Sequence, residues 1–407
     1  MKRPPRSLRA LQRAIGAMTR NGLRAGLRAR QRATKALNQA TKESAQTRGK
    51  TSSTASKAGK RAGTGSLAGH LLADRADRRG LVDCVAGLAL GVGGARRYYL
   101  YKPPGMALSE RRPLLVMLHG CAQDANAFAL STRMNRIAAR EGFLVLYPEQ
   151  DRLANPQRCW NWYETRSRRA FAEAAIIRAA IDQVCLLYPV DSQRVGIAGL
   201  SAGAGMAALV AIRYPERFCA VAMHSGVPPG VADSTASAIR AMRGRAAAVP
   251  ASIESGSPAD VPGPDKPTTQ DPTAAASSPW PPLLVIHGSA DRVVAVSNAV
   301  AAARMWAAAA GATGETARQV QRGARYPMTV TGFGARGQVA ATLCRVEGLG
   351  HAWSGGDARE RFSDARGPDA SRMVWAFMSR QFRRVLQEMP GRGALSPGGA
   401  ASLKKSG

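Results

Sequence analysis

Long apolar runs are missing from this 407-residue chain, and so is a recognisable export signal. None of its apolar runs reaches the roughly 18 residues that a membrane-spanning helix needs. The charged N-terminus is not followed by the apolar stretch of about 7–15 residues that a secretory signal peptide contains. These two absences predict a soluble protein without a transmembrane segment, located in the cytoplasm.

Metal-binding cysteine patterns are also missing. The six cysteines form no C-x-x-C pair and no other spacing typical of metal ligands, so we expect no metal site. No motif indicates an organic cofactor. Cys121 and Cys159 flank loops expected at the active site, and a bridge between them is conceivable. Free thiols are the commoner state in the cytosol.

Acidic residues are scarce, and the positive charge is unevenly spread. The chain has 58 Lys and Arg against 27 Asp and Glu, a net charge of +31. Residues 1–80 hold 20 of the basic and 3 of the acidic residues, a net of +17, which leaves +14 for the other 327. The sequence therefore indicates a basic N-terminal arm, residues 1–66, that is partly disordered or amphipathic.

The basic arm has two interpretations. It is either a solvated tail or an electrostatic anchor for an anionic surface, such as a lipid layer or a storage granule. Nucleic acid is the weaker choice of partner, because residues 1–66 contain no aromatic side chain on which bases could stack.

From about residue 95, strand-like apolar runs alternate with helical stretches. This pattern is typical of an α/β fold with a mostly parallel central sheet and helices on both faces. We expect this domain over residues 95–388, after an approach segment (67–94) and before a disordered tail (389–407). Residues 230–282 are predicted to be a flexible insertion, because their centre is rich in Pro, Ser, Ala and Thr. The predicted strands are 97–101, 114–119, 143–147, 195–199, 220–224, 283–287 and 339–346, and the predicted helices are 171–187, 202–214, 297–310 and 370–388.

One short motif, GLSAG at residues 199–203, joins a predicted strand to a predicted helix. A G-x-S-x-G sequence at a strand–turn–helix junction is typical of a nucleophile elbow. Gly199 and Gly203 leave room beside the serine, and the helix N-terminus behind it favours developing negative charge. The chain contains 42 glycines, so a structural serine is the alternative. The strand and helix around the motif favour Ser201 as a nucleophile.

A nucleophilic serine needs a base, and the chain offers five histidines. The chain order of such hydrolases is serine, acid, histidine, so the base follows the acid. His351, in the glycine-flanked loop GLGHAWSGG, satisfies this order. The remaining histidines are His70 and His119, which precede the serine, and His224 and His287, which end predicted strands where buried or loop-capping roles are common.

Asp291 is the predicted acid. It follows the strand 283–287 by a short loop at the carboxyl end of the sheet, where open α/β sheets place their sites. A loop-capping role is its alternative. An acid that orients an imidazole needs a rigid support, which the predicted insertion does not provide. The other acids considered, Glu254, Asp260, Asp265 and Asp271, all lie in that insertion.

An oxyanion hole requires two backbone N–H groups. One is expected from Ala202, directly after the nucleophile, and the other from Cys121 in the loop after the strand 114–119. Each donor of this kind typically contributes about 10²–10³ in rate.

Six segments together resemble a known family. In chain order they are LHGCAQDA (118–125), YPEQ (147–150), CWNWY (159–163), GLSAGAGMA (199–207), HGSADRVV (287–294) and GHAWSGG (350–356). Residues 95–385 are similar to the polyhydroxybutyrate (PHB) depolymerase family of esterases. The resemblance implies an α/β-hydrolase serine esterase with a catalytic triad of Ser201, Asp291 and His351. It also suggests a substrate crevice that involves Trp353 beside the base, with Gln123, Trp160 and Trp162 as further candidates; the last two could equally be packing residues.

The expected activity is hydrolysis of a carboxylic ester through an acyl-enzyme, with a hydroxyalkanoate polymer or oligomer as substrate. A feruloyl or acetyl-xylan esterase on the same scaffold is one alternative. A surface- or nucleic-acid-binding protein that acts through its basic arm is an alternative of another class. The chain lacks the added binding domain of extracellular depolymerases, which favours soluble esters, short oligomers or intracellular granules. An extracellular location, common in the family, is the alternative to the cytoplasm.

Overall fold

The computed structural model describes residues 80–81, 83–91, 94–107, 109–245, 280–312, 314–335 and 338–388. These residues all belong to one unit of the chain, Gly63–Gly407. The predicted basic arm (1–66), the centre of the predicted insertion (246–279) and the predicted tail (389–407) lie outside the described residues.

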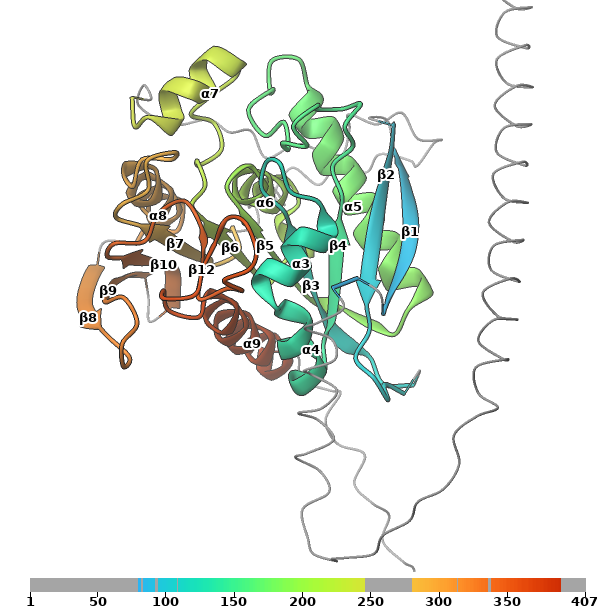
Figure 1. The fold of residues 1–407 in the computed structure, drawn as a ribbon. Helices are drawn as coiled ribbons and strands as arrows, with labels where there is room; N and C mark the ends of the chain where they lie inside the picture. Colours follow the sequence, from blue (N-terminus) through green and yellow to red (C-terminus); the bar gives the residue numbers. More distant parts are fainter. Residues whose placement is uncertain are drawn as a thin grey trace, which may run out of the picture. The chain divides into compact units, whose positions relative to one another are not determined.

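One sheet of ten strands runs through the described part of the chain (Figure 1). Its six inner strands are parallel, and antiparallel strands extend it at both edges. The mostly parallel sheet predicted from the sequence is therefore present. In spatial order the strands are β1 (Cys84–Gly91), β2 (Gly94–Tyr101), β4 (Leu144–Pro148), β3 (Arg112–Leu118), β5 (Val190–Leu200), β6 (Ala220–His224), β7 (Leu283–Gly288), β10 (Gln338–Val346), β9 (Met328–Ala335) and β8 (Gly314–Val320).

Helices cover both faces of the sheet, because the inner strands are apolar on both sides. The helices are α3 (Ala125–Thr132), α4 (Met134–Glu141), α5 (Arg169–Leu187), α6 (Ala202–Arg213), the 3₁₀ turn η2 (Pro215–Arg217), α7 (Thr235–Met242), α8 (Ser297–Ala309) and α9 (Ala370–Glu388). Along β3, Leu114 and Val116 pack into the core under α5, α6 and α8, whereas Leu115 and Met117 pack under α3, α4 and α9. None of the helices in the described ranges combines the length and hydropathy that crossing a bilayer requires.

All predicted strands and helices are present, and the structure adds elements that the sequence analysis did not predict. Strand β1 lies in the predicted approach segment, so the boundary at residue 95 is wrong. Strands β8 and β9 form the opposite edge. Several β1 and β8 side chains face solvent, so neither strand has the continuous apolar run of the inner strands. Helices α3 and α4 have only eight residues each, which is too short for a clear helical period.

Helix α7 corrects the prediction that residues 230–282 are flexible from their start. Ser234 caps this helix: its side chain accepts from the Ser237 backbone N–H, and the Ser237 side chain accepts in return from the Ser234 N–H. Ala238 and Ala241 are buried on the inner face of the helix. The Pro- and Ser-rich composition of the residues that follow it concealed this short amphipathic element.

Three histidines at the carboxyl ends of inner strands are buried. Burial lowers the pKa of His119 to about 4 and that of His224 to about 3, and it also lowers the pKa of His287. All three rings are therefore neutral at neutral pH. Their hydrogen bonds link strand ends to loops: His119 Nε2 accepts from the Gln150 N–H (3.1 Å), His224 Nε2 accepts from the Ser354 N–H (3.1 Å), and His287 Nε2 donates to the Val294 carbonyl (2.9 Å).

These histidines make stability depend on pH. In the unfolded chain they titrate near pH 6.5, so between about pH 6.5 and 4 the unfolded state binds more protons than the folded state. Their contribution is complete above the unfolded pKa and is lost as the pH falls. We expect the free energy of unfolding, measured by urea denaturation, to decrease over this range.

The matched variant is His224→Gln, which removes one of the three groups. Its free energy of unfolding should fall less steeply with decreasing pH, by up to about 1.4 kcal/mol per pH unit, the slope of one proton. An unchanged slope in this variant would contradict the assignment of His224 as a buried neutral group.

Candidate active site

Ser201 lies on a tight turn between β5 and α6. Its backbone is in a strained conformation, with φ 55° and ψ −119°, and its N–H donates to the His224 carbonyl at 2.9 Å. A Cβ atom on Gly199 would lie 2.3 Å from the Gly203 carbonyl oxygen, and one on Gly203 would lie 2.3 Å from the Leu118 carbonyl oxygen. Both glycines are required because the backbone segments leave no space for a side chain.

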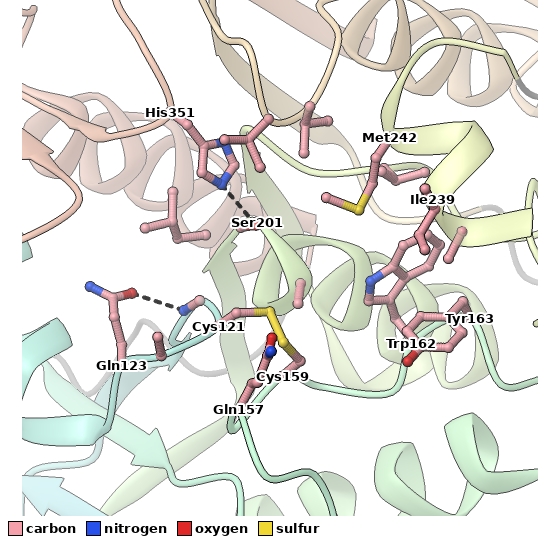
Figure 2. Close-up of a pocket in the computed structure, with 18 of the residues that line it drawn as sticks. Cys121, Gln123, Gln157, Cys159, Trp162, Tyr163, Ser201, Ile239, Met242 and His351 are labelled. Atoms are coloured by element: carbon pink, nitrogen blue, oxygen red, sulfur yellow. Dashed lines mark hydrogen bonds between the residues drawn. A yellow bond between two sulfur atoms is a disulfide. The ribbon is translucent and has the colours of Figure 1, made fainter. Parts of the chain in front are cut away.

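The structure brings Ser201, His351 and Asp291 together. His351 Nε2 lies 2.9 Å from Ser201 Oγ (Figure 2), and His351 Nδ1 lies 2.8 Å from Asp291 Oδ2. Because the carboxylate can only accept, Nδ1 carries the proton and Nε2 accepts from the serine hydroxyl. The three side chains form the hydrogen-bonded chain of a nucleophile, a base and an orienting acid.

The loop after β7 holds Asp291 as an ionised carboxylate. Its other oxygen, Oδ1, accepts from the N–H groups of Val293 and Val294, both at 2.9 Å. Burial acts to raise the pKa of Asp291, but the hydrogen bond and charge of His351, the Val294 N–H and the nearby His287 together bring it below its usual value. Asp291 therefore stays charged at neutral pH and fixes the proton of His351 on Nδ1.

Two neighbours hold the loop that carries His351. The Ser354 N–H donates to the buried ring of His224, whose own carbonyl accepts from the nucleophile's N–H. Arg133, at the junction of α3 and α4, donates to the carbonyls of Gly355 at 2.8 Å and Gly356 at 3.0 Å. These hydrogen bonds connect the His351 loop to β6, next to the nucleophile, and to the junction of helices α3 and α4.

The two predicted oxyanion donors lie beside the nucleophile, and both line the same cavity. Among the described residues, neither the Cys121 nor the Ala202 backbone N–H has a hydrogen-bond acceptor. Ala202 is the first residue of α6, where helix geometry leaves the N–H unpaired. Cys121 is bonded to Cys159 by a disulfide (S–S 2.06 Å), and the next N–H, that of Ala122, donates to the Gln157 carbonyl at 2.7 Å.

A cavity of about 530 Å³ opens beside Ser201. None of the described residues that line it is Asp, Glu, Lys or Arg, and most of its wall is apolar. In Figure 2, Trp162 and Tyr163 lie with Ile239 and Met242 at one end, and His351 lies at the other. The site therefore suits a neutral, largely apolar substrate.

Two of the four predicted crevice residues line this cavity, Gln123 and Trp162. Gln123 Oε1 accepts from the Gly120 N–H at 3.0 Å, whereas its buried Nε2 has no hydrogen-bond partner among the described residues. The prediction is wrong for Trp353, which is buried, donates through Nε1 to Ser371 Oγ at 3.0 Å and stacks on His224. It is also wrong for Trp160, which is buried against His119.

Helix α7 contributes to the site, although its role was not predicted from the sequence. Thr235, Ala238, Ile239 and Met242, spaced along one face of this helix, line the cavity. The available signal was the capping serine pair ahead of a short apolar period. Helix α7 is held to the domain by two hydrogen bonds to its last turn, from the Asn298 side chain and the Ala295 N–H.

Comparison with known proteins identifies one matching family and several similar proteins. The family described as Esterase PHB depolymerase matches residues 96–322, more than half of the chain. Poly(3-hydroxyalkanoate) depolymerase C of Paucimonas lemoignei is 31% identical over 206 residues, which are 50% of this chain and 46% of that protein. The chain thus spans about half the length of this relative. Acetylxylan esterase A of Emericella nidulans is 26% identical over 259 residues, 62% of this chain and 79% of that protein.

Among solved structures, an acetyl xylan esterase from Aspergillus awamori is similar with a TM-score of 0.51 at 18% identity. The similarity covers 70% of this chain and 94% of that one. At this identity the comparison concerns the fold, and it confirms the predicted α/β-hydrolase fold. Since the family match extends over residues 96–322, this chain belongs to the Esterase PHB depolymerase family.

Proposed function

We propose that this protein is a serine carboxylic-ester hydrolase that acts through an acyl-enzyme. The observation that carries the proposal is the hydrogen-bonded chain Ser201–His351–Asp291 at a glycine-bounded elbow beside an apolar cavity. Membership of an esterase family supports the same activity.

The proposed reaction has two halves. In the first, His351 Nε2 takes the hydroxyl proton while Ser201 Oγ attacks the ester carbonyl carbon, and the Cys121 and Ala202 N–H groups hold the oxyanion. The C–O bond then breaks, the alcohol leaves with the proton from His351, and an acyl-serine remains. In the second half, His351 deprotonates a water that attacks the acyl carbon. The bond between that carbon and Ser201 Oγ then breaks, His351 returns the proton to Oγ, and the carboxylic acid is released. Asp291 stabilises the imidazolium in both halves.

Replacing the nucleophile tests the activity directly. Ser201→Ala should lower kcat/KM for p-nitrophenyl butyrate by about 10⁴- to 10⁶-fold, because the covalent step is lost. The control is Ser167→Ala, at an exposed serine whose hydroxyl donates to Glu164 and which should keep full activity. Equal activity of wild type and Ser201→Ala would refute the proposed mechanism.

Within this activity we propose a hydroxyalkanoate polymer or oligomer as the substrate. The uncharged, apolar cavity suits a short aliphatic ester, and the relative from Paucimonas lemoignei is named a depolymerase of this class. Acetyl esters of xylan are the second candidate, favoured by the Emericella nidulans and Aspergillus awamori relatives.

A substrate panel separates these candidates. We expect kcat/KM for 3-hydroxybutyrate oligomers to exceed that for acetylated xylan and for feruloyl esters, with acid release followed by titration. A higher rate on acetylated xylan would reassign the substrate class and leave the serine mechanism intact.

We also propose that the basic arm attaches the enzyme to an anionic surface. Residues 1–66 carry 17 Lys and Arg against a single acidic residue, and clusters of this kind bind anionic lipid surfaces. Deletion of residues 1–66 should reduce cosedimentation with phosphatidylglycerol vesicles and with native PHB granules, while p-nitrophenyl butyrate hydrolysis stays unchanged.

Salt provides the control for this test. Binding of the full chain should weaken as ionic strength rises, because the attraction is electrostatic. Equal cosedimentation of the full chain and the deletion variant would exclude the arm as the anchor.

A further inference from the structure

A cluster of buried polar side chains lies beneath the loop that carries the Cys121–Cys159 disulfide. Its members come from four separate segments: β2, the loop directly after β4, the loop after Cys159, and α5. Such groups are rarely buried unless they are hydrogen-bonded to one another. The exposed fractions are 6% for Arg96, 1% for Gln150, 1% for Asn161 and 2% for Glu173.

Glu173 is the acceptor at the centre of this cluster. Its Oε1 accepts from Gln150 Nε2 at 2.7 Å, from Asn161 Nδ2 at 2.7 Å and from Arg96 Nη2 at 3.4 Å. Its Oε2 accepts from the Asn161 backbone N–H at 2.8 Å. One carboxylate thus joins three segments that are distant in the sequence.

Gln150 connects this cluster to both sides of the disulfide. Its side-chain Nε2 also lies 3.0 Å from the Cys159 carbonyl, and its Oε1 accepts from Arg96 Nε at 2.8 Å. Its backbone N–H donates to His119 Nε2 at 3.1 Å, so the His119 proton lies on Nδ1. That Nδ1–H donates to the Gly120 carbonyl at 2.8 Å.

The Gly120 carbonyl and the Cys121 N–H belong to the same peptide group. A trans peptide is planar, and its N–H points opposite to its C=O; the described residues contain no cis peptide. A hydrogen bond that fixes the direction of the Gly120 carbonyl therefore also fixes the direction of the Cys121 N–H. His119 sets this direction, and Gln150 holds His119.

We propose that Gln150, supported by Glu173 and Arg96, is a positioning residue that aims the Cys121 N–H at the oxyanion. The inference rests on the proposed function, because it assigns a role to a donor of the esterase site. Gln150 does not line the cavity among the described residues and touches no reacting atom. It acts through the His119 ring on one side of the disulfide and through the Cys159 carbonyl on the other.

The test variant is Gln150→Glu, which keeps the size of the side chain and replaces its donor by an oxygen. That oxygen would face Glu173 Oε1 and the Cys159 carbonyl, both of which are acceptors. A donor that acts on the transition state affects kcat more than KM. We expect kcat per active site to fall about 10- to 100-fold with KM nearly unchanged, less than the loss of a whole donor.

Active sites are counted with a p-nitrophenyl phosphonate, which labels each functional serine once. A phenylboronic acid supplies a second readout, because its tetrahedral adduct places an oxygen where the oxyanion forms. Its inhibition constant should rise in proportion to the fall in kcat/KM. The reciprocal pair Gln150→Glu with Glu173→Gln restores an amide–carboxylate contact and should recover part of kcat.

The matched control is Asn135→Leu. Asn135 is buried on the other face of the sheet, where it accepts from the Tyr147 hydroxyl at 2.8 Å and donates to the Gly80 carbonyl at 3.1 Å. This variant should be less stable but should keep the kcat per active site of the wild type. It separates a general loss of stability from a specific effect on the oxyanion.

Several outcomes would overturn the proposal. One is an unchanged kcat per active site in Gln150→Glu, with only its melting temperature lowered. Another is failure of both Gln150→Glu and Gln150→Met to yield phosphonate-labelled protein, which would assign the cluster to folding. Full activity of Ser201→Ala would instead refute the esterase mechanism, so the two failures are distinguishable.

Discussion

The close approach of α6 to the ends of β3 and β5 is the constraint on which the site depends. At Gly203 the helix backbone lies so near the Leu118 carbonyl that a Cβ atom would stand 2.3 Å from it. This contact brings Ser201 and the Ala202 N–H next to the loop that leaves β3 and carries Cys121. The positions of the nucleophile and of both proposed oxyanion donors therefore depend on the short distance between the backbones of α6 and β3.

Much of this arrangement was predictable because its signals are local. The inner strands β3, β4, β6 and β7 are buried almost throughout, on both faces, and their apolar runs mark their positions. A parallel sheet brings the carboxyl ends of its strands to one edge. Ser201, Asp291 and His351 each follow a parallel strand of this sheet (β5, β7 and β10), and their order along the chain is the one expected for a serine, acid and base that meet at this edge.

The direction in which a side chain points was harder to predict. Trp353 lies two residues after His351, yet its ring turns into the core and bonds to Ser371 on α9. Trp160 and Trp162 are neighbours in CWNWY, and only Trp162 lines the cavity. The position of an aromatic residue in the sequence therefore does not predict which side of a loop its ring occupies. The cluster around Gln150 could not be predicted for a related reason. Its members lie on different elements, and no sequence pattern indicates that these elements bring them together.

The shape of the cavity and the geometry of the catalytic residues depend on different parts of the chain, as helix α7 shows. It supplies a wall of the cavity but none of the hydrogen bonds among Ser201, His351 and Asp291. It is also the last described element before the Pro- and Ser-rich segment 246–279. Insertions, deletions or substitutions in α7 can reshape this wall of the cavity without removing the reacting groups. A lineage can therefore diversify the esters it accepts by altering one short helix and its connection, while the hydrolytic chemistry is inherited intact.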